Sequence, residues 1–377
     1  MDFDFSWLLW GLPIAFVLGW LSSRLDLRQL RIENRQAPKA YFKGLNFLLN
    51  EQQDQAIDAF IEAVQKDPDT SELHFALGNL FRRRGEYERA VRVHEHLLSR
   101  GDLSRADRQR AQYGLALDFL KAGLLDRAED ALRKLEGTSY APQALPALLA
   151  IYERTRDWAQ ASEVARKLDA IGQGNFAARQ AHYLCEQAAG AAPGPAGQLL
   201  REAMQVAPDA PRPGLELAAL QRRSGDAAAA FQTLARVAGT APSAMPLVAR
   251  PLTEAAVACG KQADALTILQ RSYTESPSLD VLDGIAALQG ESPAARDWYV
   301  RHLEHEPSLV AATKWLAGEK LEHEQFHARV QNALDQAVKP LTRYRCAACG
   351  FEAKQHFWQC PGCQAWDSYS PRRVEEL

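Results

Sequence analysis

Four cysteines near the C-terminal end have the spacing of a metal site. They are Cys346, Cys349, Cys360 and Cys363, and they form the pattern C-x2-C-x10-C-x2-C. Each C-x-x-C pair can fold as a tight turn that directs two sulfur atoms to one side, and two facing turns give a tetrahedral four-sulfur site. Both zinc and iron suit such a site, so the spacing predicts one metal ion without deciding between the two metals.

The residues around these cysteines fit a small metal-stabilised domain. Gly350 follows the first pair, where a left-handed backbone is expected, and Pro361 stiffens the second turn. A segment of about 40 residues needs such a staple to fold. We expect apolar cover from four aromatic side chains: Phe351, Phe357, Trp358 and Trp366.

The pattern resembles the rubredoxin-like or zinc-ribbon family. Its middle spacer is far shorter than in a free-standing rubredoxin, and Gln364 stands where the second turn usually has glycine. Both differences weigh against electron transfer more than against metal binding. The remaining cysteines, Cys185 and Cys259, lie on predicted helices, where we expect packed core thiols.

A second motif that could do chemistry is H-E-x-x-H at His323, Glu324 and His327. On a helix the two histidines share a face and can bind zinc, with the glutamate as general base. A catalytic zinc needs a third protein ligand, and Ala333 stands six residues after the second histidine, where that ligand is sought. We therefore interpret the motif, like His302 upstream, as a solvated helix face rather than a protease active site.

Composition and missing motifs exclude other classes of protein. The chain has 377 residues, with 44 Lys and Arg against 47 Asp and Glu, so its formal net charge is -3. No general attraction to nucleic acid follows, and we expect no nucleic-acid partner. The sequence also lacks a P-loop, a dinucleotide fingerprint and a G-x-S-x-G elbow. We predict that the protein is not an enzyme.

The elements that must carry these residues are helical repeats. Segments that begin at Gly44 and Gly78 match with a period of 34 residues. An alanine then recurs at steps of 30 to 38 residues, at Ala56, Ala90, Ala128, Ala161, Ala196, Ala230, Ala265 and Ala295. A proline follows twelve residues later in five units, at Pro68, Pro208, Pro242, Pro277 and Pro307. Turns between the helices carry glycine, at Gly85, Gly123, Gly225, Gly260 and Gly290.

These residue types fit pairs of closely crossing helices. Small side chains allow two helices to approach, and proline ends the second helix because it lacks an amide donor. The pattern resembles the tetratricopeptide repeat (TPR). We predict an all-α superhelix of about nine helical hairpins over residues 37–338, with a concave surface for protein partners. The segment 188–197 is a poor helix former because it is rich in glycine and proline, so we expect an irregular unit there.

An uncharged apolar stretch precedes the repeats. Between Asp4 and Arg24 lie 19 residues without a charge. A helix of that length spans roughly 28 Å, close to the thickness of a bilayer's hydrocarbon core. A cleaved signal peptide fits poorly, because the chain starts with acidic residues and no A-x-A-like site follows. We predict a retained transmembrane helix over residues 5–23.

The flanking charges predict the orientation. Asp2 and Asp4 precede the stretch, whereas Lys and Arg dominate the residues that follow it. Positive charge stays inside, so residues 1–4 are expected to be periplasmic and the bulk of the chain cytoplasmic. The predicted organisation continues with a basic linker (24–36), the TPR domain (37–338) and a rubredoxin-like metal-binding domain (339–377).

The order of these parts resembles the lipopolysaccharide assembly protein B (LapB) family over the whole chain. The resemblance implies a single-pass protein of the Gram-negative inner membrane that regulates lipopolysaccharide synthesis. It implies an adaptor that presents the lipid A pathway deacetylase to the membrane protease FtsH and is associated with lipopolysaccharide transport proteins. Two other functions stay open: a general inner-membrane assembly scaffold, and an electron carrier with iron at the four cysteines.

Overall fold

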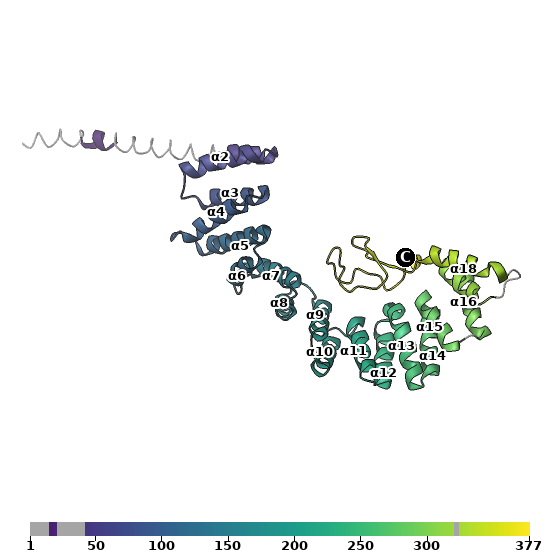
Figure 1. The fold of residues 1–377 in the computed structure, drawn as a ribbon. Coiled ribbons are helices and arrows are strands. Elements are labelled where there is room, and N and C mark those ends of the chain that lie inside the picture. Colours follow the sequence, from purple (N-terminus) through teal and green to yellow (C-terminus); the bar gives the residue numbers. More distant parts are fainter. Residues whose placement is uncertain (1–14, 21–41, 291, 320–323) are drawn as a thin grey trace, which may run out of the picture. The chain divides into compact units, whose positions relative to one another are not determined.

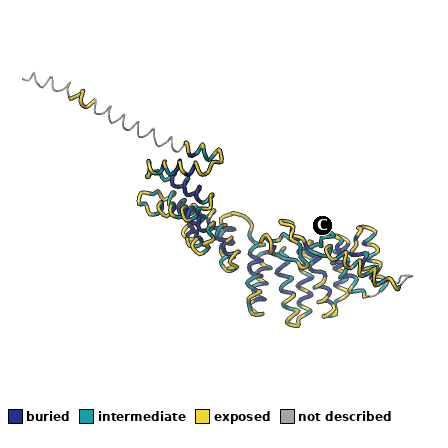
Figure 2. Tube along the Cα trace, turned by 45° about the horizontal axis from the view of Figure 1, so that its top comes forward, coloured by how far each residue is buried: buried dark blue, intermediate teal, exposed yellow. Residues whose placement is uncertain are grey.

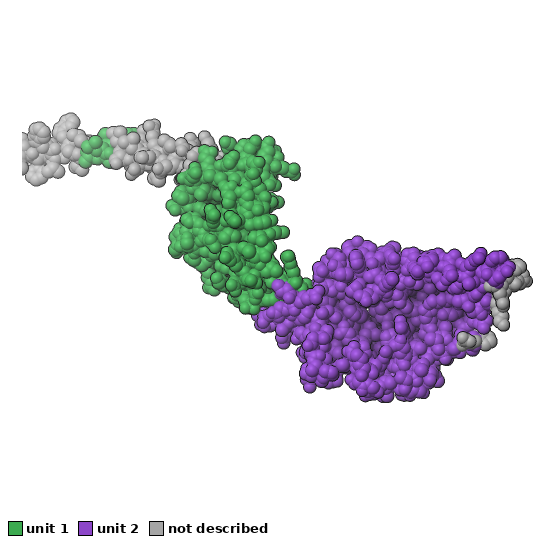
Figure 3. Space-filling view, in the orientation of Figure 1, with its two compact units in different colours: residues 1–154 green, residues 155–377 purple. Residues whose placement is uncertain are grey.

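The computed structural model describes residues 15–20, 42–290, 292–319 and 324–377 (Figure 1). The chain divides into two compact units, residues 1–154 and residues 155–377 (Figure 3). Regular structure in the described residues is almost entirely α-helical, with two short strands close to the C-terminal end. The predicted helical repeat fold followed by a four-cysteine module is therefore correct for this part of the chain.

The helices follow one another with short connections. Those that begin in the first unit are a helix over 42–49, α2 (Gln53–Lys66), α3 (Ser71–Arg84), α4 (Tyr87–Ser99), α5 (Arg105–Ala122), α6 (Leu125–Arg133) and α7 (Ala141–Thr155). Those of the second unit are α8 (Trp158–Ala170), α9 (Ala177–Ala189), α10 (Pro193–Val206), α11 (Pro211–Arg223), α12 (Ala227–Thr240), α13 (Met245–Cys259), α14 (Gln262–Glu275), α15 (Leu279–Gln289), α16 (Pro293–His305), α17 (Leu309–Ala317) and α18 (Glu324–Val338).

Short elements complete the second unit. Strands β1 (Tyr344–Arg345) and β2 (Glu352–Ala353) pair antiparallel, and one-turn 3-10 helices occur as η1 (Pro242–Ala244) and η2 (Val374–Glu376). From α2 to α6 in the first unit, and from α8 to α18 in the second, helices that are neighbours along the chain pack against each other. This nearest-neighbour packing is the arrangement of a repeat array.

The small residues of the repeat pattern lie where helices cross. All eight predicted alanines are buried, and none is more than 5% exposed. Buried residues accordingly run along the helices in both units, with exposed residues on the opposite faces (Figure 2). Alanine suits these positions because it combines a small volume with high helix propensity.

Prolines and glycines end the helices as predicted. The five prolines each lie two residues beyond the last residue of a helix, after α2, α10, α12, α14 and α16. The five turn glycines all have positive φ, between 66° and 85°. Residues with a Cβ adopt this left-handed conformation at a cost, which explains why glycine recurs there.

The prediction of an irregular unit over residues 188–197 is wrong. Helix α9 runs to Ala189 and α10 begins at Pro193, so only three residues separate them. Proline is tolerated in the first turn of a helix, because the amide that it lacks would have no partner in that turn. The segment therefore starts a helix instead of interrupting one.

A buried polar network sets the spacing of α3, α4 and α5. His94 on α4 is 1% exposed, and its Nδ1 lies 2.6 Å from a carboxylate oxygen of Asp118 on α5. Arg82 on α3 donates to the other oxygen at 2.8 Å. A Cβ added to Gly78 or Gly114 would lie 2.6 Å from the His94 ring, so both neighbouring helices need glycine there.

Among the described residues, no helix combines the length and the apolar character that a membrane crossing requires. The predicted transmembrane helix (5–23) lies largely outside the described residues, and residues 1–4 and 24–36 lie entirely outside them. Residues 15–20 are helical, and the apolar side chains of Phe16 and Leu18 are 75% and 64% exposed.

Replacing Gly114 with alanine should destabilise the first unit by about 1–3 kcal/mol, because the new methyl group displaces the His94 ring from Asp118. Hydrogen exchange should accelerate in α4 and α5. Gly239→Ala in α12 is the matched control, since no heavy atom lies within 4 Å of its added Cβ. That change should be neutral or stabilising. Equal exchange rates in the two variants would contradict this account of the network.

Candidate metal centre

The four cysteine sulfurs lie close together in the second unit. All four Sγ atoms are within 4.8 Å of one another, and none forms a disulfide. The distance from Cys346 Sγ to Cys363 Sγ is 3.8 Å, and that from Cys349 Sγ to Cys360 Sγ is 3.7 Å. Sulfurs bound at about 2.3 Å to a tetrahedral zinc are separated by about 3.8 Å. The cluster therefore fits one metal ion, and a four-sulfur tetrahedron suits either zinc or iron.

Two similar turns bring the sulfurs together. In the first, the Gly350 amide donates to the Cys346 carbonyl at 2.9 Å, and in the second the Gln364 amide donates to the Cys360 carbonyl at 2.8 Å. Gly350 has φ +76° and Gln364 has φ +62°. Gln364, which departs from the family pattern, thus adopts the left-handed conformation of the glycine it replaces, at a cost of roughly 1–2 kcal/mol.

Hydrogen bonds favour the thiolate form of the two buried cysteines. The Ser368 hydroxyl, 3.2 Å from Cys346 Sγ, lowers the pKa of this thiol to about 6, and two backbone amides of the first turn act in the same direction. Burial raises the pKa of Cys360, but backbone amides of the second turn outweigh this effect and lower it. Thiolates are the metal-binding form of cysteine, so the buried cysteine of each turn is prepared for ligation. At the exposed Cys349 and Cys363, hydrogen bonds with backbone amides lower the pKa, but those with the neighbouring thiols raise it overall. Sequence reasoning did not identify Ser368.

The side chains that pack around the sulfurs differ in part from those expected. Tyr344 and Tyr369 are 5% and 4% exposed and pack with the buried cysteines, and Phe357 packs beside them as predicted. Phe351 is 44% exposed instead. The sequence position of Tyr344, two residues before the first cysteine, could have predicted that its ring covers the sulfurs, because residues i and i+2 of a strand share a face.

The two tryptophans expected in the cover face α9 instead. The Trp366 ring stacks on His182 with 4.8 Å between centroids, and the Trp358 ring lies 6.0 Å from His182. His182 Nε2 is 2.9 Å from both carboxylate oxygens of Asp367, and its Nδ1 is 3.4 Å from Arg212 Nη1. Arginine can only donate, so Nδ1 accepts and Nε2–H donates to Asp367.

The last residues attach the metal module to two further helices. The Glu375 carboxylate accepts the backbone amide of Leu309 at 2.7 Å and the Ser308 hydroxyl at 2.8 Å, at the start of α17. Glu376 accepts the amide of Leu279 at 2.8 Å, at the start of α15. Carboxylates at helix N-termini satisfy unpaired amides and complement the helix dipole. The module therefore contacts α9, α15 and α17.

The other predicted residues stay apart from this cluster. His323 lies outside the described residues, and His327 Nε2 is 3.2 Å from the Leu316 carbonyl. His302, expected on a solvated face, is instead 2% exposed and lies 2.7 Å from the Tyr273 hydroxyl, because α16 packs it inward. Within the described ranges, the four cysteines form the one cluster of His, Cys, Asp or Glu side chains that is suited to a metal.

The two remaining cysteines have the packed environments expected of core thiols. Cys185 is fully buried, and burial raises the pKa of its thiol. Cys259 is partly buried and packs against the largest apolar cluster of the second unit. Neither thiol lies in the metal-sized cluster.

Cys360→Ser should remove the bound metal and unfold residues 344–371, because this segment has a very small apolar core. Elemental analysis of the purified chain would measure the metal, and hydrogen exchange would report the unfolding. Cys259→Ser is the matched control and should retain both metal and protection. Full metal content and unchanged exchange in Cys360→Ser would contradict a structural metal site.

Trp366→Ala should keep the metal but loosen the contact between the module and α9, since the stacked ring contributes to docking and not to ligation. The expected result is faster hydrogen exchange over residues 177–189 at unchanged metal content. Phe351→Ala removes an exposed aromatic ring of the same module and should leave α9 unaffected. If both variants behave alike, the stacking on His182 is not what holds the module.

Comparison with known proteins agrees with this architecture. Residues 344–371 match the model of a family described as a rubredoxin metal binding domain. The chain is 32% identical to lipopolysaccharide assembly protein B of Escherichia coli K12 over 376 residues, which cover 96% of this chain and 97% of the relative. It is 28% identical to the protein of the same name from Haemophilus influenzae over 388 residues, which cover 97% and 98%.

Solved helical repeat structures are also similar in part. A tetratricopeptide repeat protein from Parabacteroides merdae matches 68% of this chain and 100% of its own, with a TM-score of 0.36 and 14% identity. A chain of the Naa15/Naa10 complex bound to HypK matches 81% of this chain at a TM-score of 0.47 and 14% identity, and the match spans 48% of that chain.

The similarity to the curated relatives extends from the helical repeats through the cysteine module. On that end-to-end similarity, the chain belongs to the lipopolysaccharide assembly protein B family.

Proposed function

We propose that the protein is a membrane-anchored adaptor that regulates lipopolysaccharide synthesis and is not itself an enzyme. The observation that carries the proposal is the similarity to lipopolysaccharide assembly protein B over 96% of the chain. In this proposal the adaptor presents the lipid A pathway deacetylase to an FtsH-type membrane protease for degradation. It also contacts the lipopolysaccharide transport proteins and so links synthesis to assembly.

The proposed location is the inner membrane. A single helix over residues 5–23 crosses the bilayer, with residues 1–4 in the periplasm and the basic linker 24–36 on the cytoplasmic side. The helical conformation of residues 15–20 and the exposure of Phe16 and Leu18 support an apolar anchor. Anchoring confines the array to the membrane surface, which raises its effective concentration near a membrane protease.

The proposed division of labour follows the two kinds of structure. Residues 37–338 form the array that binds client proteins, because stacked helical hairpins present an extended concave surface. Residues 339–377 form the metal-binding domain, in which Cys346, Cys349, Cys360 and Cys363 hold one zinc or iron ion. When bound, the metal supplies a rigid cross-link between two turns.

The contacts of the module indicate a structural metal. The second turn leads directly into Trp366 and Asp367, which contact His182, and the last residues cap α15 and α17. Arg212 stays charged beside this contact, since burial lowers its pKa but Glu216 and Glu186 raise it above the ordinary value. A metal that fixes the two turns therefore also fixes how the module lies against the array.

One observation favours the electron carrier as a second candidate. Cys349 and Cys363 are exposed, whereas Cys346 and Cys360 are buried, so one side of the cluster faces solvent and is open to a redox partner. Visible absorption of the purified chain separates the candidates. A colour that is lost on reduction and restored on oxidation would support the carrier, and a colourless zinc protein would contradict it.

The adaptor function predicts that depleting the protein lengthens the half-life of the lipid A pathway deacetylase, because the protease loses its adaptor. Pulse-chase labelling in depleted and complemented cells measures this half-life. Deleting residues 5–23 should lengthen it as well, and replacing them with an unrelated single-pass helix should restore turnover. An unchanged half-life on depletion would exclude the adaptor and leave the assembly scaffold.

A further inference from the structure

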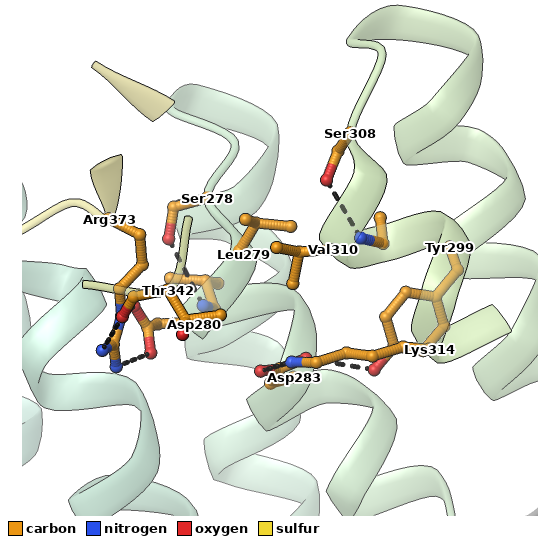
Figure 4. Close-up of polar contacts among 12 residues, drawn as sticks. Ser278, Leu279, Asp280, Asp283, Tyr299, Ser308, Val310, Lys314, Thr342 and Arg373 are labelled. Carbon is orange, nitrogen blue, oxygen red and sulfur yellow. Dashed lines mark hydrogen bonds and ion pairs between the residues drawn. The ribbon is translucent and has the colours of Figure 1, made fainter. Parts of the chain in front are cut away.

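A cavity of about 480 Å³ lies where the metal module meets the array in the second unit. Helices α15 and α17 contribute lining residues that include Asp280, Asp283 and Lys314 (Figure 4). The turn after α18, Lys354 and Arg373 complete the lining. Leu279 and Val310, each 3% exposed, contribute apolar lining. The volume is in the range of small-molecule binding sites. None of the four metal-binding cysteines lines this cavity, and the proposed adaptor function assigns no role to it.

The two carboxylates of the cavity already have partners. Asp280 accepts hydrogen bonds from Nε and Nη2 of Arg373, both at 2.8 Å. Asp283 forms an ion pair with Lys314 and accepts the Tyr299 hydroxyl at 3.1 Å (Figure 4). Because both acidic groups are neutralised within the wall, the cavity does not offer a site for a cation.

Three further cations in the lining are poorly compensated. Lys339 Nζ donates to the neutral side chain of Gln336 at 2.7 Å. Arg343 lies 3.7 Å from Glu352, which a second arginine binds more closely at 2.7 Å. The Lys354 ammonium has no hydrogen bond or ion pair in the described part of the chain. The lining thus has a formal excess of three positive charges.

We propose that this cavity binds a small phosphate-bearing ligand, whose phosphate oxygens accept hydrogen bonds from Lys339, Arg343 and Lys354. Phosphate monoesters and diphosphates carry two or three negative charges, which match this excess. Ammonium and guanidinium groups form strong charge-assisted hydrogen bonds with phosphate oxygens. A single carboxylate would neutralise only one of the three cations, so it matches the site less well.

The position of the cavity makes the ligand a regulator of docking. The apolar lining, Leu279 and Val310, belongs to the array, whereas the three phosphate-binding cations belong to residues 339–377 of the metal module. A ligand that binds only when both sides are in place stabilises the docked arrangement by mass action. Its binding should therefore slow hydrogen exchange in the segment that carries Lys354. This inference does not depend on the proteolytic role proposed above.

Titration of the metal-loaded full chain in detergent with inorganic pyrophosphate tests the proposal by isothermal calorimetry. One saturable site per chain is expected, with an affinity that falls as salt is added. Lys354→Gln should weaken binding about tenfold through loss of one charge-assisted hydrogen bond. Lys121→Gln, at an exposed position of α5, removes the same charge away from the cavity and should leave the affinity unchanged.

Competition then distinguishes the sources of phosphate. Displacement of pyrophosphate by glucose 6-phosphate supports a soluble phosphate ester, and displacement by dihexanoyl phosphatidic acid supports a lipid headgroup. Failure of both to compete would overturn the proposal. So would the absence of saturable binding at low salt, or an equal loss of affinity in Lys354→Gln and Lys121→Gln at unchanged metal content.

Discussion

The convergence of four cysteine sulfurs is the constraint on which the C-terminal part of the second unit depends. The module around them has two residue pairs of β-strand and a core of two tyrosines, two cysteines and a few partly buried neighbours. Burial on this scale does not offset the entropy of ordering about 40 residues. Cross-linking the two turns through a metal supplies the missing stabilisation, because in small metal domains binding energy is folding energy.

Much of what lies downstream of the metal is polar and directed at the array. Trp366 and Asp367 reach His182 on α9, and Glu375 and Glu376 cap the starts of α17 and α15. Such contacts require accurate positioning, since a carboxylate displaced from a helix terminus leaves the amides at that terminus without their partner. The metal thereby also orders the start of these helices, and the cavity lined by α15, α17 and the metal module forms at the same junction.

The array itself depends on a different constraint, which is close approach between helices. Three residue types make this approach possible: alanines where the helices cross, prolines just after the helices and glycines in the turns. The first unit adds a buried His94–Asp118–Arg82 network that tolerates only glycine on both neighbouring helices. A repeat fold can hold such a network because each helix contacts mainly the helices one or two places away along the chain, so local specialisation need not disturb the remaining repeats.

Sequence alone determined the features that depend on local chemistry or fixed periods. The alanine, proline and glycine positions predicted the helices and their ends, since each residue type acts on its own backbone or on the next helix. The C-x2-C spacing predicted the metal-sized cluster because two turns suffice to position four sulfurs. Three outcomes were decided by tertiary structure alone. Trp358 and Trp366 pack against His182 on α9 instead of covering the metal site. His302 is buried, and Lys354 lines the same cavity as α15 and α17. Those outcomes bring together residues as far apart as His182 and Asp367, 185 positions away in the chain, and no local pattern encodes which distant surface a side chain meets.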